Sequence, residues 1–263
     1  MDFIGDFNQI TVCPGSLALL WLGQAGFLLK DSEGRRLVVD PYLSHCVERL
    51  SGPKRLTPPA AEPEDIQPDV YLCTHSHDDH FDVDAAPVLM KSPKTKIAAP
   101  SSVLPLCDAV GIRREQVIPV KEGDIVRFAG FEVTVVYADH GELEPCAVGY
   151  LVRSEGLTLY FTGDTAYRPE QMKQAISSRP DVIVLPINGE FGNLNEEEAA
   201  RLARDSGARV AIPSHFWTFA IHRGSPLDFE QRMKEIAPDC EARFLCIGES
   251  CLLTADARKE EKT

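Results

Sequence analysis

The chain has 263 residues, 44% of them hydrophobic, which is enough to bury the core of one large domain or two small ones. Its formal net charge of −13 argues against a nucleic-acid partner, because phosphate backbones are bound by basic surfaces, although a bound cation could still hold a small anionic substrate. No run of about 18 apolar residues is present, the first residues lack the basic segment of a signal peptide and the eight cysteines form no Cys-x-x-Cys pair, so we expect a cytoplasmic protein that neither crosses nor binds a membrane.

The N-terminal part of the chain is predicted to be a β meander. Residues 17–23 and 25–30 form two strands joined by a Gly-Gln-Ala-Gly turn, and residues 36–40 form a third strand that ends before Pro41. Residues 44–68 are rich in proline and are predicted to be a long irregular loop, either a plain surface excursion or part of a functional site.

Strands and helices alternate through the rest of the chain. Strands are predicted over residues 70–73, 96–99, 117–120, 124–128, 131–137, 148–152, 157–161, 181–186, 209–213 and 244–247. Helices are predicted over residues 82–90, 101–110 and 228–236 and after Asn195, with Ser101 or Ser102 as a cap, a capping box between Asn195 and Glu198, and a charged, fraying tail over 258–263. This order favours a mixed α/β fold in which two sheets pack face to face with helices outside.

A cluster of histidine and aspartate side chains follows the apolar residues 70–73. It reads His-x-His-x-Asp-His over residues 75–80, which is richer in metal ligands than a polar loop that only caps the next helix. Alternation in an extended segment aims His75 and His77 at one point, and Asp79 and His80 lie one turn further on. The motif therefore predicts two adjacent metal ions.

Three other predicted strands run directly into a metal-binding residue. Strands of one sheet region that end at the same edge bring such residues together, so we expect a single site. We assign His75, His77 and His140 to one metal ion and Asp79, His80 and His215 to the other, with Asp164 as a bridge through its two oxygens.

Two divalent metal ions are the expected cofactors. Histidine and aspartate suit Zn²⁺ and Mn²⁺, with iron as a third candidate. Two ions about 3.5–4 Å apart could share and activate a water molecule at neutral pH, so no separate base is needed. Asp79 and Asp164 are accordingly the predicted catalytic residues, and Asp79 is also a candidate for protonating a leaving alkoxide.

The order of these motifs, with Thr-Gly-Asp at 162–164, resembles the metallo-β-lactamase superfamily of hydrolases. The resemblance implies a four-layer αββα sandwich formed by a single domain over 1–263, with its core in about 16–250. It also implies that Asp40, in Val-Val-Asp-Pro, is a buried aspartate that supports the metal histidines; the alternative is a turn residue before a proline.

A narrower similarity involves Pro-Gly-Ser-Leu-Ala at 14–18, Trp-Leu-Gly-Gln-Ala-Gly-Phe at 21–27 and Gly-Glu-Phe-Gly-Asn at 189–193. These segments are similar to the L-ascorbate-6-phosphate lactonase branch. This branch implies a hydrolase that opens a lactone or cleaves an ester of a small, sugar-phosphate-like substrate, and it implies a homo-oligomer by analogy.

Substrate-binding residues are less sharply indicated by the sequence. Candidates near the ligands are Tyr167, Asn188, Glu190, Trp217, His222 and Arg223. The alternatives are core or wall packing for Trp217, a solvated surface loop for His222 and Arg223, and ordinary polar loop positions for Asn188 and Glu190. If the substrate carries a phosphate, the candidates for holding it are Lys54, Arg55, His222 and Arg223.

Other functions use similar motifs. A phosphodiesterase or ribonuclease would use the same metals, but the acidic charge and the missing basic patch count against it. A redox di-iron protein would prefer a carboxylate at His77, and a non-catalytic metal-binding protein would tend to lose a ligand.

Overall fold

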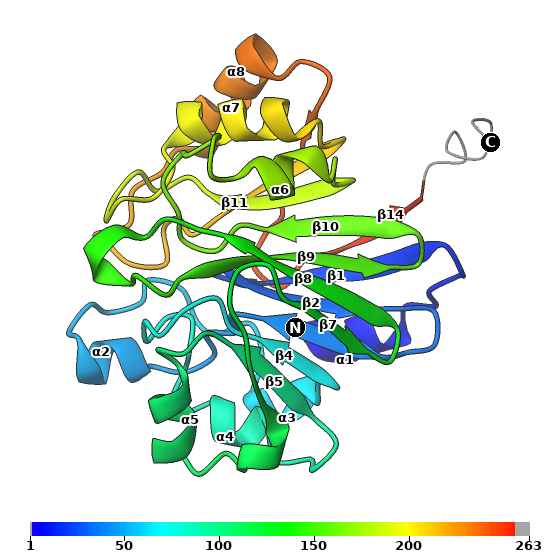
Figure 1. Cartoon of the computed structure of the whole chain (residues 1–263), viewed down its shortest axis with the longest axis vertical. Coiled ribbons are helices and arrows are strands. Elements are labelled where there is room, and N and C mark those ends of the chain that lie inside the picture. The colour runs from blue at the N-terminus through cyan, green and yellow to red at the C-terminus, as the bar shows by residue number, and fades with distance from the viewer. Residues whose placement is uncertain (1, 256–263) are drawn as a thin grey trace.

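The computed structural model describes residues 2–255, which form two seven-stranded sheets packed face to face (Figure 1). The strands of the first sheet are β1 (Ser16–Gly23), β2 (Gly26–Lys30), β3 (Arg36–Val39), β4 (Val70–Leu72), β5 (Lys96–Ala99), β6 (Val117–Pro119) and β14 (Ser250–Thr254), in the order β14-β1-β2-β3-β4-β5-β6. Those of the second are β7 (Ile125–Phe128), β8 (Phe131–Tyr137), β9 (Val148–Ser154), β10 (Leu157–Phe161), β11 (Val182–Pro186), β12 (Val210–Ser214) and β13 (Glu241–Ala242), in the order β13-β12-β11-β10-β9-β8-β7.

Helices cover the outer faces of both sheets, which completes the predicted αββα arrangement (Figure 1). On the side of the first sheet are α1 (Phe3–Gln9), α2 (Cys46–Leu50), α3 (Pro63–Ile66), α4 (Ala86–Leu89) and α5 (Leu104–Ala109). On the side of the second are α6 (Lys173–Ser177), α7 (Glu196–Ser206) and α8 (Pro226–Ile236). Within residues 2–255 no helix has both the length and the apolar character to cross a membrane.

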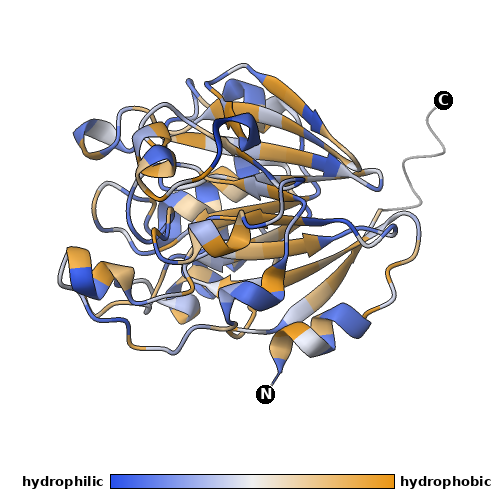
Figure 2. Cartoon of the chain, turned by 90° about the horizontal axis from the view of Figure 1, so that it is seen from below, coloured by the Kyte–Doolittle hydropathy of each residue, from blue (hydrophilic) through white to orange (hydrophobic). Residues whose placement is uncertain are grey.

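Side-chain alternation in β1 shows why the layers form. Leu17 and Leu19 lie in the core shared with the second sheet, whereas Ala18 and Leu20 lie in the core beneath the outer helices. Successive side chains of a strand point to opposite faces, and a strand covered on both faces is apolar at nearly every position. Figure 2 shows the same pattern as predominantly hydrophobic strands in the interior of the molecule.

The strand directions determine where the site lies. β3, β4, β5 and β6 pair in parallel, as do β10, β11, β12 and β13. β8 is antiparallel to β9, which is antiparallel to β10, so β8 and β10 run in the same direction. The loops that follow β8, β10, β11 and β12 therefore leave the second sheet at one edge, where α/β proteins bind ligands. The loop after β4 of the first sheet meets them there.

Several predicted elements differ from the structure. The segment 44–68 contains two short helices, α2 and α3, and the helix predicted over 82–90 is helical only over Ala86–Leu89. The N-cap residue of α5 is Val103, and not Ser101 or Ser102 as predicted. Residues 244–247 are not a strand, because the Glu249 carboxylate accepts from the Cys246 backbone N–H and forms a turn.

The predicted capping box of α7 is confirmed. The Asn195 side chain accepts from the Glu198 backbone N–H at 3.0 Å, and the Glu198 carboxylate accepts from the Asn195 N–H at 3.1 Å. Both contacts satisfy helix N–H groups that lack a partner within the helix. The predicted tail over 258–263 lies outside the described residues.

Candidate metal centre

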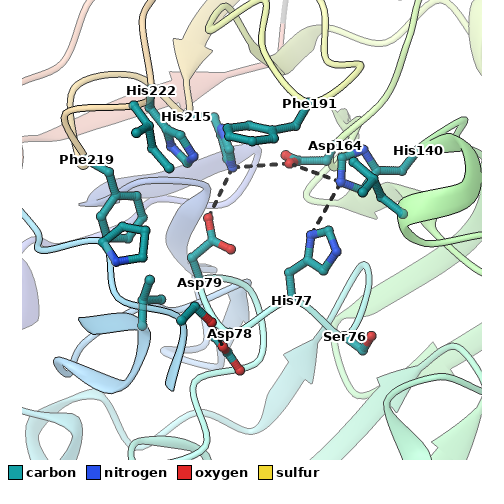
Figure 3. A pocket seen from close by; sticks show the side chains of 15 residues that line it. Ser76, His77, Asp78, Asp79, His140, Asp164, Phe191, His215, Phe219 and His222 are labelled. Carbon is teal, nitrogen blue, oxygen red and sulfur yellow. Dashed lines mark hydrogen bonds and ion pairs between the residues drawn. The ribbon is translucent and has the colours of Figure 1, made fainter. Parts of the chain in front are cut away.

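Loops after β4, β8, β10 and β12 carry the seven predicted metal ligands to one place. Figure 3 shows those that line the cavity: His77, Asp79, His140, Asp164 and His215. Their ligand atoms form three overlapping groups, within each of which all atoms lie within 4.8 Å of one another. The groups are His75 with His77 and His140, His75 with His80 and Asp164, and Asp79 with His80 and His215.

Three imidazoles meet in the first group. His77 Nδ1 lies 3.1 Å from His75 Nε2 and 3.4 Å from His140 Nε2. A ring nitrogen of a neutral histidine is either a donor or an acceptor, so among three nitrogens that face one another at least two are alike, and either two lone pairs or two N–H groups oppose each other. A cation between them removes this repulsion, and the arrangement fits a metal ion.

Asp164 lies between the first group and the second. Its Oδ2 is 3.2 Å from His215 Nε2 and 3.8 Å from His140 Nε2, and its Oδ1 is 3.4 Å from His80 Nε2. This Oδ1 is buried and has no hydrogen-bond partner among the described residues. A buried carboxylate oxygen without a donor is unfavourable unless a cation approaches it, so Asp164 fits the predicted bridging role.

Gly163 allows Asp164 to come this close to the first sheet. Its φ is +63°, and a Cβ at this position would lie 2.9 Å from the Val148 carbonyl oxygen and 3.0 Å from Thr74 Cβ. Any other residue would have to push these groups away. The Thr-Gly-Asp motif therefore has a steric reason as well as a chemical one.

Asp40 and Thr74 orient two of the histidines. Asp40 accepts from the Thr74 N–H at 2.8 Å and hydroxyl at 2.6 Å, and its Oδ2 lies 2.9 Å from His80 Nδ1. Because the Thr74 hydroxyl donates to Asp40, it is an acceptor for His75 Nδ1, at 3.0 Å. Both histidines thus carry the proton on Nδ1 and direct the Nε2 lone pair to the ligand cluster.

Three supporting residues were missed by the sequence analysis. Gln24 Nε2 donates to Asp79 at 2.6 Å, Asn193 Nδ2 donates to Asp164 at 2.8 Å, and the Glu144 carboxylate accepts from the hydroxyl and N–H of Ser76. Gln24 and Asn193 lie in glycine-containing turns that carried the family resemblance, but polar residues are ordinary in turns. No separate signal in the sequence indicated these contacts.

The backbone conformation is a further indication that this region is a functional site. Eight described residues other than glycine have positive φ, and five of them lie at this site or in the loops that carry it. Strained backbone of this kind persists where the surrounding structure holds it, often at functional sites. The five residues are Gln24, Asp40, Phe191, His215 and Trp217.

The electrostatics of the cluster match a binding site for divalent cations. Burial lowers the pKa of His75 and His140, so both are neutral with an available lone pair. Burial alone would raise the pKa of Asp164, but the imidazoles of His215 and His80 outweigh it and hold this pKa well below the usual range. Burial alone would lower the pKa of His80, but Asp164 and the other nearby carboxylates outweigh it and raise this pKa, so a metal ion at His80 Nε2 would replace a proton. Neutral imidazoles and an ionised carboxylate are the forms that bind metal, and they suit zinc, manganese or iron.

A cavity of about 310 Å³ opens above the ligands (Figure 3). Of the predicted substrate-binding residues, only His222 lines it. The His222 ring stacks on that of His215 with centroids 4.6 Å apart, and its Nδ1 lies 3.1 Å from Gln24 Nε2. Burial, followed by the nearby His215, lowers the pKa of His222 to about 4, so this ring is neutral.

The other candidates do not line the cavity. Tyr167 donates its hydroxyl to Asp205 on α7, so its polar end is directed at that helix. Arg223 is 81% exposed and pairs with Glu190 at 3.1 Å, and Trp217 is 57% exposed. Asn188 is buried, and both polar atoms of its side chain lack a hydrogen-bond partner among the described residues.

Arg55 is not available to hold a phosphate. It is buried, stacks over the Tyr42 ring at 4.5 Å and donates to the backbone carbonyls of Thr57 and Ser44. Lys54 is exposed and does not line the cavity. The expectation of a phosphate site at these two residues is therefore corrected: Arg55 fastens the loop after α2 to the body of the protein.

Comparisons with known proteins agree with this geometry. A UPF0173 metal-dependent hydrolase of Aeropyrum pernix is 30% identical over 88% of the chain and 96% of its own length. The "Probable L-ascorbate-6-phosphate lactonase UlaG" of Escherichia coli is 28% identical over 84% of the chain and 75% of that protein. Igni18, a metallo hydrolase of Ignicoccus hospitalis, shares the fold with a TM-score of 0.74 at 20% identity, covering 92% of the chain and 100% of that structure. The family profile described as β-lactamase superfamily domain matches residues 18–215, and the chain therefore belongs to the β-lactamase superfamily.

Proposed function

We propose that the protein is a metal-dependent hydrolase that opens a lactone or cleaves an ester of a small molecule. The observation that supports this most strongly is the position of Asp164, which faces both histidine groups at the floor of a cavity large enough for a small substrate. The proposed cofactors are two divalent ions, Zn²⁺ or Mn²⁺ with iron as a third candidate. When bound, such ions lower the pKa of water and polarise a carbonyl group.

The proposed ligand assignment keeps His75, His77 and His140 in one site and Asp79, His80 and His215 in the other, with Asp164 shared. Gln24 holds Asp79 in place through a hydrogen bond of 2.6 Å, so the carboxylate oxygen is fixed before substrate arrives. Asn193 does the same for Asp164. Preorganised groups of this kind need little rearrangement during a reaction.

His222 is proposed to donate a hydrogen bond to the substrate. Gln24 Nε2 has two hydrogens: one is donated to Asp79, and the other points to His222 Nδ1. His222 Nδ1 must then be the acceptor, so its proton is on Nε2, at the other side of the ring. Since the ring lines the cavity, this N–H can reach a carbonyl or leaving-group oxygen.

Hydrolysis of two substrate classes tests the proposal. The protein, reconstituted with Zn²⁺ or with Mn²⁺, is assayed on γ-butyrolactone and p-nitrophenyl acetate, and separately on bis-p-nitrophenyl phosphate. We expect metal-dependent turnover of the lactone or the ester and a large loss in His77→Ala. Cleavage of the phosphodiester alone would replace this proposal with a phosphodiesterase, and metal binding without any turnover would leave a non-catalytic metal protein.

We also propose that the protein is located in the cytoplasm. All eight cysteines are free thiols in the structure, and most of the buried ones pack among apolar residues. This is the state that a reducing compartment maintains.

A further inference from the structure

We propose that the preferred substrate is an uncharged lactone or ester with an apolar chain next to the reacting carbonyl, and not a phosphorylated sugar. This inference rests on the proposed hydrolase function and concerns the same cavity. It comes from the side chains that surround the ligand cluster, which differ in kind from the ligands themselves.

Apolar side chains from four separate segments form the walls of the cavity. They come from α2 and the loop after it, from the turn after His140, and from the loops after β11 and β12. Phe191 and Phe219 are seen beside the ligands in Figure 3. The six apolar lining residues are Val47, Pro53, Leu143, Phe191, Phe219 and Ile221.

Three of these six apolar side chains are exposed to solvent. Leu143 is 56% exposed, Phe191 47% and Ile221 48%, and all three border the same opening. Large apolar side chains that gather around one opening are unfavourable in water, and such patches mark binding sites. An apolar group bound between them would remove this surface from water.

The walls are held in place by the backbone. The Glu190 carbonyl accepts from the Asn193 N–H at 3.0 Å, and the Asn193 side chain contacts Asp164, so the Phe191 loop is fastened to the floor of the cavity. On the other side, the Phe219 carbonyl accepts from the His222 N–H at 3.0 Å. The apolar walls thus stand at a fixed place relative to the proposed position of the reacting carbonyl.

A phosphate group would find no cationic side chain here. Among the described residues that line the cavity there is no lysine and no arginine, and Asp78 is the charged lining residue beyond the ligand cluster. Arg55 is committed to backbone carbonyls, and Arg223 is paired with Glu190 outside the cavity. Phosphate is normally recognised by arginine or lysine, and Asp78 would repel it.

A series of γ-lactones with alkyl chains of increasing length tests this inference. We expect kcat/KM to rise from γ-butyrolactone to γ-octalactone and γ-decalactone, by about fourfold for each methylene that is buried. L-ascorbate 6-phosphate should be hydrolysed more slowly than γ-octalactone. The ratio of γ-octalactone to γ-butyrolactone turnover should fall at least about tenfold in Phe191→Ser and Ile221→Ser, since each removes a wall. In the matched control Leu227→Ser, an exposed leucine of α8, the ratio should be unchanged.

Calorimetry provides a readout that is independent of turnover. Alkyl-substituted γ-lactams, which are stable analogues of the lactones, are titrated into the metal-loaded protein. The heat-capacity change of binding should become more negative as the alkyl chain lengthens, because apolar surface is buried. This trend should disappear in Ile221→Ser.

Failure of this inference can be told apart from failure of the proposed function. If γ-butyrolactone is hydrolysed but longer lactones are no better, or if L-ascorbate 6-phosphate is preferred, the apolar substrate class is wrong while the hydrolase proposal stands. If no lactone or ester is hydrolysed, the proposed function is wrong. If Ile221→Ser changes the sedimentation of the protein and leaves the lactone series flat, the apolar rim is an interface between copies, which also overturns the inference.

Discussion

The floor of the cavity, where the proposed metal ligands meet, and its rim, formed by Leu143, Phe191 and Ile221, are held by different interactions. The floor is buried, polar and cross-linked by side-chain hydrogen bonds from Asp40, Gln24 and their neighbours. The rim is apolar and exposed, and only its backbone is fastened. Buried polar groups have few tolerated alternatives, whereas exposed apolar groups can be exchanged at little cost to folding. The difference suggests that the floor determines the chemistry and the rim selects the substrate.

The largest effect is expected from Asp164→Asn. The amide keeps the shape of the carboxylate but removes its charge and one acceptor oxygen, so it can no longer serve both histidine groups. We expect kcat/KM to fall by about a thousandfold or more, and metal bound per chain, measured by elemental analysis, to decrease. Asp239→Asn, at an exposed aspartate after α8, is the matched control and should change neither quantity. Full metal content and activity in the Asp164 variant would remove this residue from the site.

A smaller effect on activity is expected from His222→Phe, which changes a side chain that lines the cavity. Phenylalanine preserves the stacking on His215 and the contact with Phe219 but lacks the Nε2–H donor. We expect kcat to fall by about a hundredfold with little change in KM, and His222→Gln to recover part of the loss. His45→Phe, at an exposed histidine, should behave like wild type. A rise in KM with normal kcat would mean that His222 only shapes the pocket.

Asp40→Asn tests whether the hydrogen bonds beneath the floor set its affinity for metal. The amide cannot accept from both His80 and Thr74 as the carboxylate does, so the His80 ring loses its orientation. We expect metal affinity, measured by competition with a chelator, to fall by about 10- to 100-fold. Asp31→Asn is the matched control: Asp31 is equally buried, follows β2 and accepts backbone N–H groups far from the site. It should destabilise the fold without weakening metal binding.

The floor could be predicted from sequence because its residues are attached to strand ends. His140, Asp164 and His215 each follow an apolar strand by a few residues, and the direction of the strands brings such positions to one edge. Metal ligands are also few in kind, so their order along the chain is informative. The same argument gave the two sheets, since strands covered on both faces are apolar throughout.

The rim could not be predicted because its residues lie in loops, where apolar residues follow no regular spacing. Tyr167 and Trp217 follow ligands closely in sequence, yet the first is directed at α7 and the second is exposed. Phe191, in the Gly-Glu-Phe-Gly-Asn motif, was not predicted to bind substrate, although it lines the cavity. The left-handed backbone conformation at Phe191 and Trp217 determines where these side chains point. Phenylalanine and tryptophan rarely adopt this conformation, so the residue types do not predict it. The supports at Gln24 and Asn193 were missed because polar residues are ordinary in turns.

Glu144 joins the two regions, because it follows Leu143 of the rim and accepts from Ser76, which lies between two proposed metal ligands of the floor. Burial alone would raise the pKa of Glu144, but the hydrogen bonds from Ser76 outweigh it and hold this pKa below the usual value. A carboxylate whose pKa is lowered in the folded state stabilises the fold above the pKa of the unfolded chain, and this contribution is lost as pH falls through the folded-state pKa.

Glu144→Gln should therefore lower the free energy of unfolding by about 1–2 kcal/mol at neutral pH. The difference from wild type should shrink below about pH 4, where the carboxyl group of the unfolded and then of the folded protein becomes protonated. Urea unfolding of metal-free protein at both pH values measures this without a contribution from metal release. Glu142→Gln, at the exposed neighbouring glutamate, should have little effect at either pH. A difference that stays constant with pH would mean that Glu144 acts through its shape and not its charge, and the rim would then be joined to the floor by packing alone.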